Sequence, residues 1–242
     1  MAKKADKKKK QAKTPKMRWT VRLRRWLARG LVGVVALVVL WVFLYAVVNP
    51  PTTPYMIAEA RRLDGVDREW VPIKDIAPEM RRAAVAAEDA NFCLHWGFDM
   101  GAIRAALDDG AVRGASTISQ QTVKNVYLWQ GRSWPRKALE ALLTPLVEAA
   151  WTKERILEVY LNVAEFGEGI FGVDAAALHY FGETASGLSA GQASLLAAIL
   201  PDPKGRSAAQ PSDFVQRRAR AIRDGAATIR ADGRADCFGA GS

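Results

Sequence analysis

Residues 114–125 read GASTISQQTVKN, and seven of these twelve side chains are hydroxyls or amides. A helix buried in a core would carry more apolar residues, and a solvent-exposed helix would carry more charge. Ser116 or Thr117 can cap a helix that runs over residues 117–128. The start of such a helix also presents free backbone N–H groups to anions such as phosphate. The stretch therefore indicates a polar helix that either lines a binding site or packs on loops.

One face of this predicted helix is rich in hydrogen-bond donors. Ser116, Gln120 and Lys124 follow one another at intervals of four residues, with Gln121 and Asn125 beside them. Uncharged donors with one lysine suit a ligand that carries both sugar hydroxyls and phosphate. Packing on loops alone would not explain why amides and hydroxyls outnumber charges so heavily.

A second segment, AAEDANFCLHWGFD at residues 86–99, carries an acidic pair. Glu88 and Asp89 lie near the C-terminal end of an alanine-rich helix, where the helix dipole disfavours negative charge. Aromatic residues follow directly, and such surroundings raise the pKa of a carboxyl group, which suits a general base. The alternative is an exposed acidic pair at a helix end. His95 is expected to be a structural histidine.

The segment GRSWPRKALEALLTPLVE at residues 131–148 supplies cations and another acid. Arg132, Arg136 and Glu140 are spaced four residues apart, so Arg136 and Glu140 form an i,i+4 pair on a helix. The alternative is an ordinary surface ion pair, which contributes only about 0.2–0.5 kcal/mol.

Composition and cysteine content bound the class of protein. The 242 residues suffice for one domain with an appendage, and 50% hydrophobic residues exclude general disorder. Cys93 and Cys237 can pair in an oxidising compartment, but two thiols do not make a disulfide framework. The absence of a C-x-x-C motif and the presence of only two histidines argue against a structural zinc site.

The net charge of +10 is concentrated at the N-terminus. Residues 1–30 hold 13 of the 35 Lys and Arg and one acid, so the rest of the chain has a net charge of −2. A nearly neutral body excludes a nucleic-acid partner.

An uncharged run, LVGVVALVVLWVFLYAVV, occupies residues 31–48. As a helix it spans roughly 27 Å, close to the hydrocarbon thickness of a bilayer. A cleaved signal peptide is the alternative, but the run is longer than the apolar core of an ordinary signal peptide, and no A-x-A site follows. The basic residues before it predict a cytoplasmic N-terminus, an exported remainder and contact of the tail with anionic lipid.

Beyond the apolar run, the sequence predicts a mainly α fold. NPPTTP at residues 49–54 reads as a stiff linker. Pro78 suits a first helical turn, and Ser189 with Gln192 has the spacing of a capping box. No alternating strand pattern appears, and residues 231–242 are expected to form a loose tail. Further helices are predicted at 101–109, 117–128, 136–150, 153–164, 173–181, 190–200 and 212–230.

Together these segments resemble one family. EDANFCLHWGFD (88–99), GASTISQQTVKN and RKALE (136–140) are similar to successive signature motifs of the bacterial peptidoglycan glycosyltransferases. KERILEVYLN (153–162) and FGEGIFGVDAAALHYFG (166–182) resemble the fourth and fifth motifs. All five occur in the family's order, between about Ile76 and Pro203. The chain has no room for a transpeptidase domain, so it resembles the monofunctional, membrane-anchored members.

Departures from the family pattern are small. Ala115 stands where a second glycine is common, Ser119 where threonine is common, and Gln192 where glutamate is frequent. Pro145 interrupts the helix after Glu140. None of these removes an expected catalytic residue.

The resemblance implies a lysozyme-like helical domain with a small jaw region near the membrane. The apolar stretch of this jaw is expected within residues 98–113. We expect a basic cytoplasmic tail at 1–29, a transmembrane helix at 30–49, a linker and jaw entry at 50–70 and a glycosyltransferase domain at 71–230. The localisation implied is the bacterial inner membrane, single-pass, with the catalytic domain periplasmic.

The resemblance also implies an activity and its residues. Such enzymes polymerise lipid II into β-1,4-linked glycan and release undecaprenyl diphosphate, by inverting transfer. Glu88 corresponds to the general base and Glu140 to a second catalytic carboxylate at the donor site. The substrate-binding positions implied are Asp89, Ser116, Gln120, Gln121, Lys124, Arg132, Arg136 and Lys137. The last four are cations expected to hold the pyrophosphate, and Gln120, Gln121 and Lys124 are expected to face the cleft.

No cofactor is required by the sequence, with Mg²⁺ or Mn²⁺ as a candidate aid at the diphosphate and no dedicated metal site. Expected partners are lipid II, the growing glycan, the bilayer and other proteins of cell-wall synthesis or division.

Two other functions compete with this one. A lysozyme-like hydrolase or lytic transglycosylase would use Glu88 as an acid but would leave the cation cluster unused. A non-enzymatic membrane-tethered scaffold would not need Glu88 at all.

Overall fold

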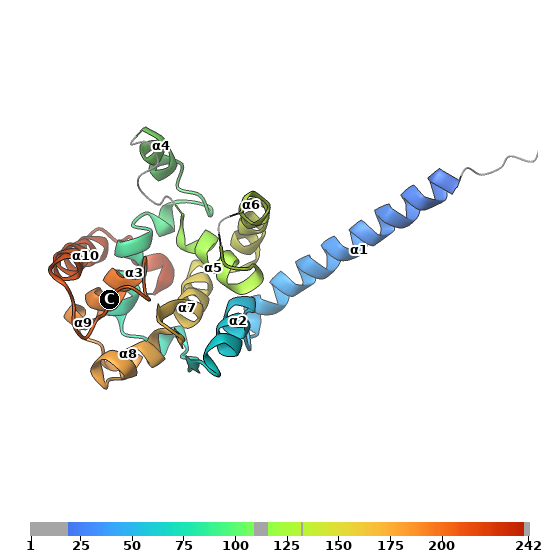
Figure 1. Ribbon diagram of the computed structural model, residues 1–242. Coiled ribbons are helices and arrows are strands. Elements are labelled where there is room, and N and C mark those ends of the chain that lie inside the picture. The colour runs from blue at the N-terminus through green and yellow to red at the C-terminus, as the bar shows by residue number, and fades with distance from the viewer. Residues whose placement is uncertain (1–18, 109–115, 132, 240–242) are drawn as a thin grey trace, which may run out of the picture. The chain divides into compact units, whose positions relative to one another are not determined.

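Helices make up nearly all of the regular structure, as Figure 1 shows, and the predicted mainly α fold class is confirmed. The computed structural model describes residues 19–108, 116–131 and 133–239. These fall into two units that divide between Trp41 and Val42. The helix α1 (Trp19–Val47) begins in the first unit, and its last residues belong to the second.

The helices of the second unit match most of those predicted. Every helix predicted after residue 100 is present, with bounds that differ by at most two residues. Thr117 and Ser189 are the N-caps of the helices they precede, each in a capping box. The helices are α2 (Pro54–Leu63), α3 (Pro78–Glu88), α4 (Met100–Asp108), α5 (Ile118–Tyr127), α6 (Trp134–Ala150), α7 (Lys153–Val163), α8 (Val173–Phe181), α9 (Ala190–Ile199) and α10 (Asp213–Ala231).

Three features differ from the sequence prediction. The segment read as a linker contains α2, because Pro54 occupies a first-turn position and Thr53 caps the helix by accepting the Met56 N–H at 3.2 Å. The helix α6 continues through Pro145, which removes only one backbone hydrogen bond. A small sheet also exists, with order β1-β3-β2. Its strands are too short to show alternation: β1 (Asp67–Arg68), β2 (Glu165–Gly167) and β3 (Ile170–Phe171).

The apolar segment of α1, Val21–Val47, is long and apolar enough to cross a membrane. It starts before the uncharged run, because the arginines that precede the run are good helix formers. Its C-terminal end is anchored to α7. The Trp151 indole N–H donates to the Val42 carbonyl at 2.8 Å, and the Arg155 guanidinium donates to the carbonyl of Val48 at 2.9 Å. Arg155 also donates to the carbonyl of Tyr45 at 3.1 Å, which belongs to the last turn of α1, where carbonyls lack partners within the helix.

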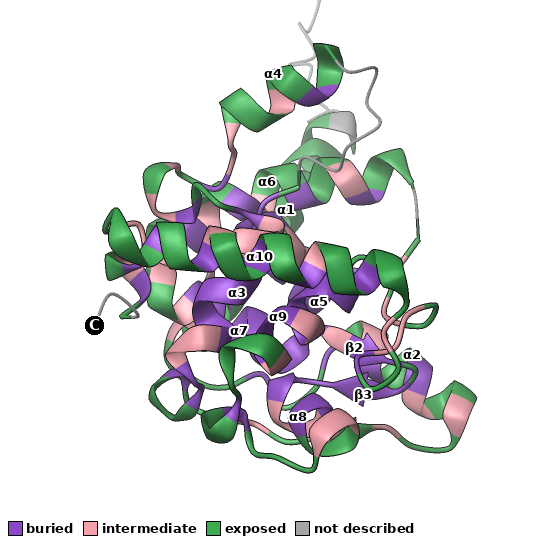
Figure 2. Cartoon of the chain, turned by 90° about the vertical axis from the view of Figure 1, so that its left-hand side faces the viewer, coloured by how far each residue is buried: buried purple, intermediate pink, exposed green. Residues whose placement is uncertain are grey.

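The core of the second unit lies where two groups of helices meet. One group is α3, α9 and α10, and the other is α5 between α6 and α7. Small residues such as Ala84 on α3 and Ala197 on α9 are fully buried, which allows these helices to approach closely. Figure 2 shows buried residues concentrated on α3, α5, α7 and α9, while the outward face of α10 is exposed. This packing fixes the end of α3 against the start of α5.

The C-terminal segment is not the loose tail that the sequence predicts, at least through Gly239. A 3₁₀ turn (Asp236–Phe238) packs the fully buried ring of Phe238 against Phe92. Cys237 forms a disulfide with Cys93, which lies 144 residues earlier in the chain. The glycine-rich and aspartate-rich composition conceals this contact, because a single buried ring and a single thiol give no periodicity.

We expect the double variant Cys93→Ala, Cys237→Ala to have a free energy of unfolding lower by about 2–5 kcal/mol, since the bond closes a long loop in the unfolded chain. Denaturation of the protein in detergent measures the change. A dithiol should destabilise the wild type to the same extent and leave the double variant unaffected. Equal stability of all three samples would contradict the prediction.

Candidate active site

Glu88 ends helix α3 and has two unlike carboxylate oxygens. Its Oε2 accepts a hydrogen bond from the Gln121 side-chain amide at 2.8 Å. Its Oε1 lies 3.7 Å from the guanidinium of Arg218 and accepts no hydrogen bond from any described residue. The side chain is only 12% exposed. The alternative of an exposed acidic pair is therefore wrong.

Burial raises the pKa of Glu88. The hydrogen bond from Gln121 and the charges of Arg218 and Lys124 oppose this rise, and the neighbouring Asp89 adds to it. The result is a carboxyl group that protonates more readily than an exposed glutamate and that has one oxygen without a hydrogen bond to the described chain. Such a group is suited to accept a proton.

Lys124 lies on α5, one turn after Gln121, and interacts electrostatically with both Glu88 and Glu140. Burial lowers the pKa of Lys124, while the charges of Glu140 and Glu88 raise it. The nearby charge of Arg136 lowers it further. The ammonium group therefore lies within the fields of both carboxylates and of the other cations.

The cations of α6 surround Glu140. Arg136 donates to Glu140 Oε2 at 2.6 Å, and Lys137 donates to the other oxygen, Oε1. Lys137 also donates to the Ser116 hydroxyl at 3.3 Å. The Glu140 side chain is 3% exposed, so the pair is not an ordinary surface ion pair. Arg132, the remaining predicted cation, lies outside the described residues.

Two hollows adjoin these side chains. A polar pocket of about 370 Å³ receives Gln121, Lys124 and Asn125 from α5 and Tyr160 from α7. A second hollow, of about 290 Å³, is lined by residues of the start of α6, including Arg136 and Lys137. The remaining residues of the polar pocket are Tyr55, Gln130, Ala164, Glu165, Leu200, Pro201, Asp202, Pro203 and Lys204.

Gln120 does not face the polar pocket, and this prediction is wrong. Its side-chain oxygen accepts the Thr117 backbone N–H at 3.1 Å, while the Thr117 hydroxyl accepts the Gln120 N–H at 3.2 Å. This is a capping box, whose T-x-x-Q pattern was visible in the sequence. The amide of Gln120 therefore stabilises the start of α5.

Asp89 also acts inside the protein. Its Oδ2 accepts the Ile118 backbone N–H at 3.0 Å, and its Oδ1 contacts His95 Nε2 at 2.8 Å. Asp89 is buried, so the predicted substrate contact is replaced by a link between the end of α3 and the start of α5. His95, which the sequence predicts to be structural, makes this contact through Nε2, whereas its buried Nδ1 has no hydrogen-bond partner among the described residues.

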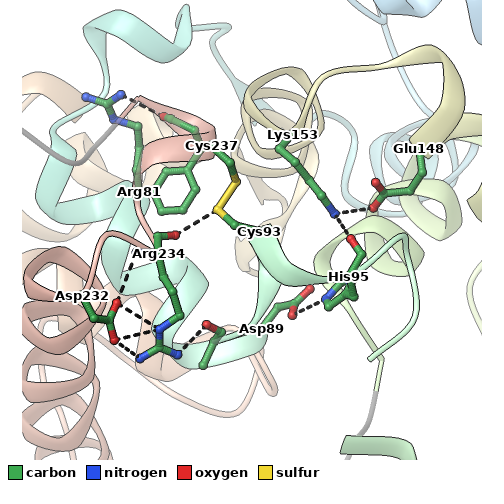
Figure 3. The surroundings of a disulfide bond; sticks show 11 residues. Arg81, Asp89, Cys93, His95, Glu148, Lys153, Asp232, Arg234 and Cys237 are labelled. Atoms are coloured by element: carbon green, nitrogen blue, oxygen red, sulfur yellow. Dashed lines mark hydrogen bonds and ion pairs between the residues drawn. A yellow bond between two sulfur atoms is a disulfide. The ribbon is translucent and has the colours of Figure 1, made fainter. Parts of the chain in front are cut away.

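The Ser119 hydroxyl of α5 also forms a hydrogen bond inside the protein. The Ser119 hydroxyl donates to Glu148, which accepts from Lys153 at 2.8 Å, and Lys153 also donates to the His95 carbonyl at 2.8 Å (Figure 3). The polar composition of residues 114–125 thus has two causes. One side of the helix supports the fold, and the other side lines the pocket.

Sequence reasoning missed two residues of the site. Tyr160 donates to the Gln121 side-chain oxygen at 3.4 Å, and burial keeps its pKa well above that of an exposed tyrosine. It belongs to the segment that resembles the fourth motif, which could have identified it. Arg218 faces Glu88 from α10, 130 residues away in sequence. No local pattern indicates that contact.

Comparison with known proteins agrees with this arrangement. The family model named Transglycosylase matches residues 56–226. The chain belongs to this family. It is 61% identical over 238 residues to the biosynthetic peptidoglycan transglycosylase of Jannaschia sp. (strain CCS1), covering 98% of this chain and 99% of that protein. The family match begins within α2, earlier than the predicted domain start at residue 71.

Other relatives carry the same name. The protein of Stutzerimonas stutzeri (strain A1501) is 52% identical over 207 residues, covering 81% of this chain and 86% of its own length. The protein of Caulobacter vibrioides (strain ATCC 19089 / CIP 103742 / CB 15) is 45% identical over 219 residues, covering 89% of this chain and 96% of its own length. The predicted transglycosylase family and its peptidoglycan glycosyltransferase activity are confirmed.

Glu88→Gln should raise the melting temperature at neutral pH. The folded-state pKa of Glu88 is raised, so the folded wild type binds the proton more tightly and loses stability as pH rises through the window between the ordinary and the raised value. A neutral glutamine escapes this loss, and the difference between the proteins should vanish at pH values below the ordinary carboxyl pKa. Thermal denaturation at pH 4 and pH 7.5 measures it, with the exposed Glu183→Gln as control. A variant that melts below the wild type at neutral pH would contradict the expectation.

Proposed function

We propose that the chain is a membrane-anchored glycosyltransferase that polymerises lipid II into β-1,4-linked glycan and releases undecaprenyl diphosphate. One observation carries the proposal. Glu88, a carboxyl group with a raised pKa, is hydrogen-bonded to Gln121, which shares a pocket with the cation Lys124.

In the proposed reaction, ionised Glu88 accepts the proton of the 4-hydroxyl of the acceptor sugar. The hydroxyl oxygen attacks the anomeric carbon of the growing chain, and the bond from that carbon to the diphosphate oxygen breaks with inversion. The electron pair leaves on the diphosphate. Oε1 of Glu88, which accepts no hydrogen bond from the described residues, is the oxygen assigned to this proton.

The departing diphosphate is a good leaving group that needs charge stabilisation more than a strong acid. Lys124, Arg136 and Lys137 supply that charge, and we place Arg132 with them on the family resemblance. Glu140 binds both Arg136 and Lys137 and so holds these cations in position for the donor. The described residues contain no group of three or more His, Cys, Asp or Glu side chains that could hold a metal ion. Assistance by Mg²⁺ or Mn²⁺ bound to the diphosphate stays a prediction from the family resemblance.

A periplasmic catalytic domain and a cytoplasmic N-terminus complete the proposal. The apolar segment Val21–Val47 supports an anchor, and the basic residues before it favour a cytoplasmic N-terminus. The Cys93–Cys237 disulfide fits an oxidising compartment outside the cytoplasm. A hydrolase acting on finished glycan is disfavoured, because the cations around Glu140 would have no phosphate to bind.

Polymerisation of labelled lipid II tests the reaction. Glu88→Gln should lower the rate by about 10²–10⁴-fold, because a general base is lost. The exposed Glu183→Gln should polymerise like the wild type. Digestion of finished glycan without polymer formation would identify a hydrolase. Neither activity in the wild type would favour a scaffold.

The dependence of kcat/KM on pH should follow the raised pKa of Glu88. The base form is active, so the rate should increase with pH through a value above the ordinary range of carboxyl groups. Arg218 lowers this pKa through its charge, so Arg218→Gln should move the acidic limb to higher pH. Arg220→Gln, an exposed change on the same helix, should leave the limb in place. Superimposable profiles of wild type and Arg218→Gln would contradict the assignment.

A further inference from the structure

The backbone on both sides of Glu88 is held by arginines from the C-terminal part of the chain. Arg218 of α10 donates to the carbonyl of Ala87 at 3.4 Å. Arg234, after the end of α10, donates to the carbonyl of Ala90 at 2.9 Å. Two long-range contacts therefore hold the short stretch that carries the proposed base.

A covalent contact follows three residues later, where Cys93 is bonded to Cys237 (Figure 3). Cys93 also lies next to the C-terminal segment through a contact between its sulfur and the Arg234 carbonyl at 2.9 Å. We name residues 232–239 the C-terminal clamp, and residues 87–93 the base segment. The clamp fastens the base segment through one hydrogen bond and one disulfide.

The C-terminal clamp is itself held firmly. Asp232 accepts from Arg234 Nε at 2.9 Å and from Nη2 at 2.7 Å, which orients the guanidinium toward Ala90. At the other end, Arg81 of α3 donates to the Gly239 carbonyl at 2.8 Å. The ring of Phe238 is fully buried between these points. The first residue of the clamp is tied to α10, because the Asp232 N–H donates to the Thr228 carbonyl at 3.0 Å. The clamp is therefore held at both ends and can set the position of the base segment.

A displacement of the base segment would reach the catalytic groups directly. Asp89 lies within it and binds the Ile118 N–H at the start of α5. The same helix carries Gln121, whose amide donates to Glu88. A shift of about 1 Å in the position of reacting groups can lower a rate by roughly 10²-fold.

We propose that the C-terminal clamp positions Glu88 for catalysis and that the Cys93–Cys237 disulfide makes this positioning sensitive to redox conditions. The inference rests on the proposed function. The clamp follows residue 226, where the match to the family model ends. Both cysteines are half-buried and can be reached by a small dithiol. Reduction transfers two electrons and two protons from the dithiol, which becomes a disulfide, and leaves two protein thiols.

The test compares steady-state lipid II polymerisation by the full chain in detergent as oxidised wild type, dithiol-treated wild type and the double variant Cys93→Ala, Cys237→Ala. Assays run well below the melting temperature of the least stable sample. We expect kcat to fall at least about fivefold without the disulfide, with KM changed less than twofold, because the base is misplaced while substrate contacts remain. The acidic limb of the pH profile should shift too, since the neighbours of Glu88 move. Dithiol should not affect the double variant.

A variant that keeps the disulfide gives an independent measurement. Arg234→Gln loses the charged contact with Ala90 and should lower kcat in the same direction, whereas Arg230→Gln, at an exposed arginine in the last turn of α10, should not. Unchanged kcat and an unchanged pH profile, with both thiols titrated as free, would overturn the proposal and leave the bond a stabilising one only. An oxidised wild type that makes no polymer would instead overturn the proposed function.

Discussion

The hydrogen bond from the Ile118 amide to the Asp89 carboxylate is the contact on which the site depends. The first N–H groups of a helix have no partner within the helix, and a carboxylate placed there satisfies one of them and interacts favourably with the dipole. Asp89 also follows directly on Glu88 at the end of α3. One buried side chain thereby fixes the end of one helix against the start of another. This junction between the two helices brings Glu88 close to Gln121 and Lys124.

Two charged groups of the site are buried, which removes the favourable hydration that they would have in water. Burial disfavours the ionised forms of both Glu88 and Lys124. Other buried carboxylates of the described domain have ion-pair partners at close range. Glu140 with Arg136, and Glu148 with Lys153, illustrate that pairing. Groups whose charge is poorly compensated reduce stability, and the packed interior around α3, α5 and α7 provides the rigidity that keeps them in place. Glu140 accepts hydrogen bonds from two cations, whereas one oxygen of Glu88 accepts none from the described residues. This difference agrees with the different roles proposed for the two carboxylates.

Local sequence patterns were sufficient for most of the helices and for part of the site. Caps, prolines and apolar spacing located α5 through α10, because each of these signals acts within a few residues. The same rules failed where one residue type has two uses. Pro54 could end a linker or begin α2, and Gln120 could bind a ligand or complete a capping box.

Contacts between distant segments were beyond such rules. The approach of Arg218 to Glu88 and the pairing of Cys93 with Cys237 depend on how α3 and α10 pack, and no periodicity records that packing. The strand β1 is likewise defined by its pairing with β3, about a hundred residues later in the chain, rather than by its own composition. The resemblance to the family supplied the roles of Glu88 and Lys124, but the signature motifs that carry it end before the C-terminal segment.

The position of Cys237 has a consequence for biogenesis. It follows every helix of the domain in sequence, whereas its partner Cys93 lies near the beginning. A ribosome delivers the chain from the N-terminus, so Cys93 is delivered well before Cys237. The sulfur–sulfur bond can close only after that turn has been delivered, so it is among the last contacts of the domain to form.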